Sequence, residues 1–376
     1  MAKFQPKTKD ELKELVDDLK INLGDIDTSL ITDMSSLFFY TKRKDFSGIE
    51  LWDVSNVDNM SEMFSGAKFF NADISQWNVS KVKDMSSMFQ SALTFNKSLN
   101  AWNVGNVENM SQMFSGAESY SQSMNAWNVS QVTDMGSMFS GAKYFNAGIN
   151  EWNVSQVTNM SDMFRGAKYF NQPLDKWDVS NATDMNNMFC GAGFFNQSLD
   201  SWNVGKVSNM NSMFYEATSF NQPLNSWNVS NVTNMECMFN LAKAFNQPLD
   251  KWDVGNVENM RAMFDSATSF NQPLDKWDVG NVTDMVSMFN CAESFNQPLN
   301  AWNVSQVTDM SSMFGGASAF NQPLDKWDVS NVSDMNSMFY NATSFNQSLK
   351  SWNVSNVSDM SEMFDGAEAY TYGELE

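Results

Sequence analysis

Histidine is absent from this sequence of 376 residues, and cysteine occurs only three times. A chain without histidine has no serine–histidine or cysteine–histidine catalytic pair and no histidine ligand for a metal. The cysteines, Cys190, Cys237 and Cys291, show neither a Cys-x-x-Cys spacing nor a disulfide framework, and we interpret them as incidental small apolar residues. No glycine-rich phosphate loop precedes a predicted helix. We therefore expect a protein that is not an enzyme.

Long apolar runs and excess positive charge are also missing. No run approaches the ~20 apolar residues of a membrane-spanning helix, and the charged N-terminal sequence lacks the apolar core of a secretory signal peptide. Lys and Arg total 23 against 44 Asp and Glu, which gives a formal charge of −21. Such a surface repels nucleic-acid phosphates. We expect a soluble protein that binds no nucleic acid and does not insert into a membrane.

The sequence does contain a strict repeat. Each of the 13 tryptophans is followed by the next after 25 residues, from Trp52 to Trp352. Of the 29 methionines, all but Met1, Met34 and Met124 occupy two fixed positions of this repeat, and a phenylalanine follows the second. A period of this length indicates an array in which each unit buries its apolar face against its neighbours.

Two apolar periodicities alternate inside the unit. Trp252 and Val254 alternate with a polar residue, which predicts a strand of about three residues. From Met260, apolar residues follow at i+3, i+4 and i+7, the spacing of a helical stripe of two to three turns. The preceding Asn259 is Asn or Asp in all thirteen units, as expected of a helix N-cap. A return loop, often containing proline, leads to the next strand.

The predicted fold is therefore a leucine-rich-repeat-like solenoid, with a short parallel strand and a short helix in each 25-residue coil of a right-handed superhelix. Residues 1–24 contain a capping box, Thr8 to Glu11, and are expected to form an N-terminal capping helix. Residues 25–370 form one degenerate and thirteen regular repeats, and residues 371–376 a polar tail. The last coil is predicted to be poorly shielded, which favours end-to-end self-association or fraying.

The repeat resembles a known family. Residues 270–289 read F-N-Q-P-L-D-K-W-D-V-G-N-V-T-D-M-V-S-M-F, which closely resembles the mycoplasma-lipoprotein-type repeat of the BspA-like leucine-rich-repeat surface proteins. The resemblance covers about 25–370. It implies a bacterial solenoid at the cell surface or secreted, with adhesion to host matrix or other proteins in some members. The chain as given has no signal peptide, so a cytoplasmic location stays open.

One polar position per unit lies between Trp and Val and is predicted to face outward. Stacked coils would align these side chains about 4.8 Å apart, either as a hydrogen-bond ladder that stabilises the sheet or as a binding surface. Neighbouring carboxylates, such as Asp253 beside Asp278, would also allow weak Ca²⁺ binding; no other cofactor or metal is expected. The members of this outward ladder are Asp53, Asn78, Asn103, Asn128, Asn153, Asp178, Asn203, Asn228, Asp253, Asp278, Asn303, Asp328 and Asn353.

The residue before each Trp varies more and forms a rim beside the ladder. Variation on a regular frame is where a solenoid keeps its specificity, although a solvated charged face would look the same. The rim lysines proposed for binding are Lys176, Lys251, Lys276 and Lys326.

These patterns favour a binding scaffold for a protein partner, such as a host matrix or surface protein. Two alternatives are an intracellular acidic solenoid that binds a basic protein surface by charge mimicry and a purely architectural rod. A row of sugar-binding tryptophans is a further alternative to a tryptophan core.

Overall fold

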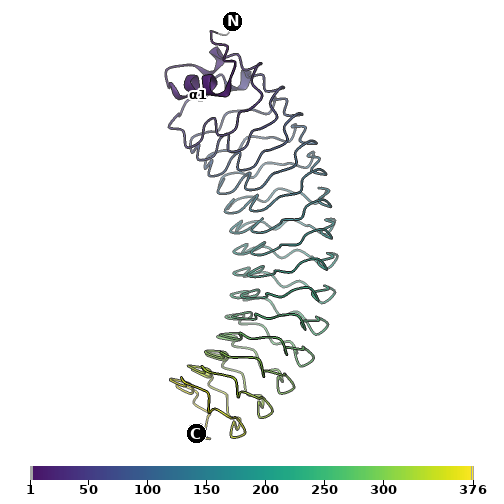
Figure 1. The fold of residues 1–376 in the computed structure, drawn as a ribbon, viewed down its shortest axis with the longest axis vertical. Helices are drawn as coiled ribbons and strands as arrows, with labels where there is room; N and C mark the ends of the chain where they lie inside the picture. Colours follow the sequence, from purple (N-terminus) through teal and green to yellow (C-terminus); the bar gives the residue numbers. More distant parts are fainter. Residues whose placement is uncertain (1–2, 374, 376) are drawn as a thin grey trace. The chain divides into compact units, whose positions relative to one another are not determined.

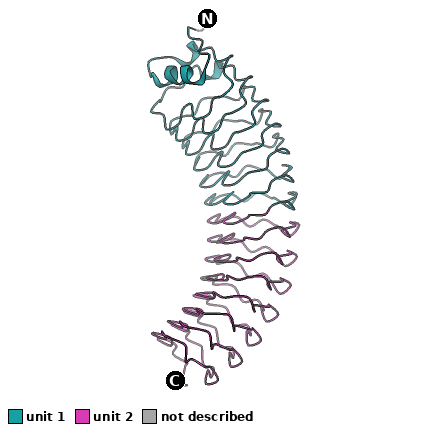
Figure 2. Ribbon diagram, viewed as in Figure 1, with its two compact units in different colours: residues 1–182 teal, residues 183–376 magenta. Residues whose placement is uncertain are grey.

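The computed structural model describes residues 3–373 and 375, and the chain divides into two compact units, residues 1–182 and 183–376 (Figure 2). Each unit is a stack of 25-residue coils (Figure 1). The regular elements among the described residues are helix α1, Lys9–Asp17, and two 3-10 helices, η1 at Leu23–Asp25 and η2 at Ile49–Leu51. Of the tail predicted at 371–376, residues 374 and 376 lie outside the described part.

Helix α1 begins where the capping box predicts. The Thr8 hydroxyl accepts a hydrogen bond from the amide of Glu11 (3.2 Å), and the Glu11 carboxylate accepts one from the amide of Lys7 (2.6 Å). Leu12 and Val16 are fully buried, so the helix packs its apolar stripe on the first coils. No lysine or arginine lies in the last turn of the helix, and its C-terminal carbonyls are bonded instead by the buried side chain of Arg43.

The helix predicted in every coil is wrong. Residues 261–266 and their equivalents form a run of turns, and among the described residues the repeat contains no α-helix. The second residue after the first Met has a positive φ in each regular coil, as at Ala262 (51°), and so does the residue four positions later, as at Ser266 (57°). Left-handed residues at this spacing interrupt every helical turn.

Hydrogen bonds to the next coil replace those of a helix. The amides of Ala262 and Phe264 donate to the carbonyls of Val286 and Met288, at 2.8 and 2.9 Å, and the pattern recurs along each unit. The amides between them close turns within the coil, as Met263 does on Met260 (3.2 Å). Every backbone donor of this segment thus has a partner without helix formation.

The predicted strand at the tryptophan is also misplaced. The described residues contain no extended strand, and parallel pairing between coils occurs as isolated bridges at the Asn/Asp position expected to cap the helix, such as Asn259 with Asp284. The side chain of Asn259 accepts a hydrogen bond from the amide of Arg261 (2.9 Å). It therefore caps a turn two residues ahead, which is why Asn and Asp are the residue types found there.

The core agrees with the predicted assignment of apolar residues. All thirteen tryptophans are buried, with at most 6% of their surface exposed, which excludes a solvent-facing row of indoles that bind sugars. The ring of Trp252 stacks 6.4 Å from that of Trp277, and its Nε1–H donates to the carbonyl of Leu224 in the preceding coil (2.9 Å). Phe264 stacks on Phe289 at 5.7 Å. Each coil thus covers the apolar side of its neighbour within the unit.

A substitution by glycine at the second left-handed position tests whether this segment forms turns or a helix, because glycine changes the stability of the two conformations in opposite directions. Glu216 is exposed at φ 56°, and glycine occupies the equivalent position in coils such as those of Gly191 and Gly316. Because the left-handed conformation costs an L-residue about 1–2 kcal/mol and glycine loses about 0.5–1 kcal/mol of unfolded-state freedom, Glu216→Gly is expected to stabilise the chain by about 0.5–1 kcal/mol. Urea denaturation measures this. If the segment were a helix, the same substitution would lower the free energy of unfolding by about 1 kcal/mol. Destabilisation by Glu216→Gly would therefore contradict the turn conformation.

Candidate binding surfaces

The outward ladder faces solvent as predicted, and its side chains form bonds within their own coils. All thirteen residues, from Asp53 to Asn353, are exposed. In each, the side-chain oxygen accepts a hydrogen bond from the amide two residues ahead, as Asp253 does from Gly255 (3.2 Å) and Asn303 from Ser305 (3.2 Å). These short side chains close turns in their own coil. They take the place of the bonds from coil to coil that one of the two alternatives predicted at this position.

A side-chain ladder between coils does occur in the return loop. Within the second unit, Oδ1 of Asn246 accepts from the amide of Asn271 (3.0 Å) and from Nε2 of Gln272 (3.0 Å) in the next coil. The same pair of bonds joins Asn271 to the following coil, and these amides are half-buried. The sequence signal for this ladder is the repeated Asn-Gln of the loop.

The ladder carboxylates are not gathered into a metal centre. Asp253 and Asp278 lie at the same position of adjacent coils, and one oxygen of each already accepts a backbone amide. Hydrogen bonds from Ser330 lower the pKa of Asp328. Within the described part of the chain, no group of three or more Cys, Asp or Glu side chains is placed to hold a metal ion.

The four rim lysines are exposed, and two of them form ion pairs with the preceding coil. Lys176 pairs with Glu151, which raises the pKa of the lysine, and Lys276 lies 3.6 Å from Asp250. Lys251 and Lys326 are tied to the preceding coil by their backbone amides. The rim therefore presents cations on a backbone that is fixed from coil to coil.

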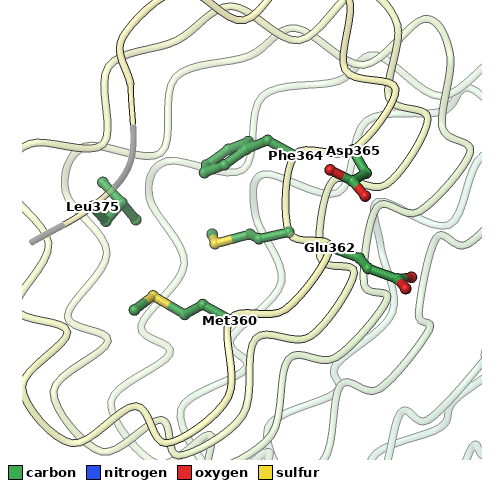
Figure 3. Close-up of a pocket in the computed structure, with 6 residues that line it drawn as sticks. Met360, Glu362, Phe364, Asp365 and Leu375 are labelled. Carbon is green, nitrogen blue, oxygen red and sulfur yellow. The ribbon is translucent and has the colours of Figure 1, made fainter.

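A shallow groove runs beside the ladder in the first unit. Charged side chains of both signs line it, including Lys81, Lys83 and Glu108. A second hollow, of about 320 Å³, lies on the last regular coil between Met360, Phe364 and Leu375 (Figure 3).

The groove beside the ladder has a volume of about 650 Å³ and is an open depression of the surface, not an enclosed cavity. Asn106 and Thr133 line it, and their equivalents in most other coils are also polar and exposed. Such a surface suits contact with an extended partner better than enclosure of a small molecule.

Exposed aromatic side chains, which the sequence reasoning missed, gather at the turn before the return loop. Phe69, Tyr144 and Tyr169 occupy the same position of the unit and expose 53%, 50% and 38% of their surface. A lysine ammonium lies over each ring, at 5.1, 5.0 and 5.7 Å from the centroid. The signal available in the sequence was the departure from the repeat, because most other coils have Ser or Ala at this position.

Comparison with known proteins gives a family match and a weak likeness to solved structures. The model of a single family, described as "Mycoplasma protein of unknown function, DUF285", matches residues 10–127, 119–218, 194–290 and 270–373. No curated protein matches the chain. Among solved structures, the crystal structure of a TLR13–ssRNA13 complex is similar at 9% identity and a TM-score of 0.23, over 86% of this chain and 53% of that one. The chain thus spans about half of that protein's length.

Among the described residues, no helix has the length and apolar character needed to cross a membrane. The four family matches overlap and together run from residue 10 to residue 373, across the stacked coils of both units. The chain therefore belongs to the family of Mycoplasma proteins of unknown function, DUF285.

Proposed function

We propose that this protein is a non-enzymatic, protein-binding solenoid that uses the outward ladder, the rim and the adjoining loops against a large partner. The observation that carries the proposal is the exposure of equivalent side chains in every coil, on a backbone held by hydrogen bonds to the next coil. A rigid frame of this kind lowers the entropic cost of presenting many weak contacts at once. The open groove near Lys81 and Glu108 is consistent with such use.

The partner class we favour is a host matrix or surface protein, with the chain acting as an adhesin at the bacterial surface or after secretion. The resemblance of the 25-residue unit to BspA-like repeats supports this role. The family description is consistent with a bacterial origin but gives no activity.

Charge mimicry is the second candidate, and the formal charge of −21 favours it. Five of these acidic residues are exposed in the ladder, at Asp53, Asp178, Asp253, Asp278 and Asp328. In this case the chain would occupy a basic protein surface, and its affinity would depend mainly on long-range attraction.

Salt dependence separates the two candidates. We expect the immobilised protein to retain matrix proteins at both low and about 0.3 M salt, because contacts within the interface are screened less than distant charges. The rim variant Lys251→Ala/Lys276→Ala/Lys326→Ala should weaken this binding about tenfold, as expected for loss of interface contacts worth about 1.4 kcal/mol. Alanine already occupies the rim position at Ala101 and Ala301, so the change suits the fold. Pull-downs from host matrix and source-cell lysate, run side by side, measure both.

A matched variant of the ladder tests the charge-mimicry candidate. Asp253→Asn/Asp278→Asn/Asp328→Asn keeps the turn-closing oxygen that eight other coils supply from Asn. If binding is lost at about 0.3 M salt and in this variant, the partner is held by charge mimicry and the adhesin proposal fails. If neither source yields a retained protein at either salt concentration, the chain is an architectural rod.

A further inference from the structure

We propose that two lysine–tyrosine pairs in the first unit, Lys143–Tyr144 and Lys168–Tyr169, form a docking site for an acidic segment of a protein partner. This inference deepens the proposed function and rests on it for the identity of the partner as a protein. It places one specific contact outside the ladder and the rim.

The two pairs lie at the same position of adjacent coils and are held in register. The amide of Tyr169 donates to the carbonyl of Lys143 (3.3 Å), and the two tyrosine rings stack with centroids 5.5 Å apart at an interplanar angle of 7°. Lys143 Nζ lies 5.0 Å from the centroid of the Tyr144 ring, and Lys168 Nζ lies 5.7 Å from that of Tyr169. Both rings nevertheless remain substantially exposed.

This geometry determines which chemistry the pairs can bind. One face of each ring is turned toward the other ring, and an ammonium lies over each ring. A sugar would need an open ring face for stacking. The ring edges carry partial positive charge, and the hydroxyl groups are hydrogen-bond donors. Together with two ammonium groups, they form a surface that favours carboxylates.

The local charge is reversed relative to the chain as a whole. The equivalent segments 112–120, 137–145 and 162–170 contain three cations, Lys143, Arg165 and Lys168. Their two acids are Glu118, at the lysine position of the preceding coil, and Asp162, which lies 3.7 Å from Arg165. Three cations against two acids contrast with 23 against 44 in the whole sequence. An acidic segment would therefore be attracted here and repelled by most of the remaining surface.

A polypeptide fits the composition and the spacing of the pairs. Tyrosine edges and lysine stems offer apolar contact area beside the charges, and tyrosine is enriched at the energetic centres of protein interfaces. Alternate side chains of an extended peptide project on one side about 6.6–7 Å apart, close to the 5.5 Å between the rings. Two acidic residues spaced in this way could meet both pairs.

The test uses the whole chain and a short peptide of alternating glutamate and glycine that carries a neutral fluorophore. We expect fluorescence anisotropy to show saturable binding, and Tyr144→Ser/Tyr169→Ser to weaken it by about tenfold or more. Serine stands at this position in coils such as those of Ser219 and Ser269, so the variant should fold as the parent does, which circular dichroism and the melting temperature check. A peptide with glutamine in place of glutamate should not bind.

Introducing the same two pairs into the second unit tests for a gain of binding, which a loss of folding cannot produce. Thr268→Lys/Ser269→Tyr with Glu293→Lys/Ser294→Tyr reproduces the pairs on two adjacent coils. It should raise the number of peptides bound from one to two per chain.

The outcomes distinguish this inference from the proposed function. Equal peptide binding by the parent and the tyrosine variant, no saturable binding, or tighter binding of a polyuronic acid through the same tyrosines would overturn the docking site. Capture of matrix proteins does not depend on that result. If the peptide binds through the tyrosines but no matrix protein is retained, the proposed function fails and the site stands as a property of the surface.

Discussion

Replacement of Arg43 by methionine is expected to destabilise the N-terminal cap by about 3–5 kcal/mol. The guanidinium donates to the carbonyl of Val16 through Nε and Nη2 (3.3 and 3.1 Å), to that of Asp18 (2.8 Å) and to that of Ile21 (3.2 Å). The residue is only 4% exposed. Methionine retains the apolar stem but leaves these carbonyls without their donor, at about 1–3 kcal/mol for each fully buried group.

The effect should be local to the cap. Coils of a repeat protein are stabilised mainly by their neighbours, so hydrogen exchange at the amides of Leu12 and Val16 is expected to accelerate before that of the central coils. Arg43→Lys should rescue little, because one ammonium cannot reproduce the planar array of donors. The control is Lys42→Met, which changes an exposed neighbour and should shift stability by no more than about 0.5 kcal/mol. An equal loss in both variants would contradict a specific role of Arg43.

Trp252→Ala is expected to cost about 3–5 kcal/mol, the range for a large aromatic residue removed from a core. The indole is 3% exposed and stacks on Trp277, so its removal opens a cavity between adjacent coils. It also removes the donor to the carbonyl of Leu224. Urea denaturation followed by tryptophan fluorescence and circular dichroism measures the change, and fraying of neighbouring coils would reduce the apparent value.

Trp252→Phe separates packing from hydrogen bonding. It keeps an aromatic ring in the stack, loses the Nε1–H donor and leaves a smaller cavity, so its cost should be clearly lower than that of alanine. The exposed Lys251→Ala in the same coil is the control and should be nearly neutral. A neutral result for Trp252→Ala would show that the indole does not stabilise the stack and would contradict the core described above.

Part of the candidate surface followed from the pattern of the repeat. The positions from Asp53 to Asn353 were predicted to face outward because they alternate with buried residues, and they do. Their bonding was not predictable from alternation alone, since an Asn or Asp side chain can bond its own turn or a neighbouring coil equally well. The pairs at Tyr144 and Tyr169 were not predicted because the repeat shows what coils share, whereas these tyrosines depart from the serine or alanine that most coils have at this position.

The sequence by itself determined the 25-residue period, the tryptophan, methionine and phenylalanine core, and the start of helix α1 after Thr8. Only the tertiary structure decided the backbone conformation around Met260. Apolar residues at i, i+3, i+4 and i+7 report which side chains are buried, and both a helix and a series of turns can bury them. The choice depends on where the amides find acceptors, and here the carbonyls of the next coil, such as that of Val286, provide them.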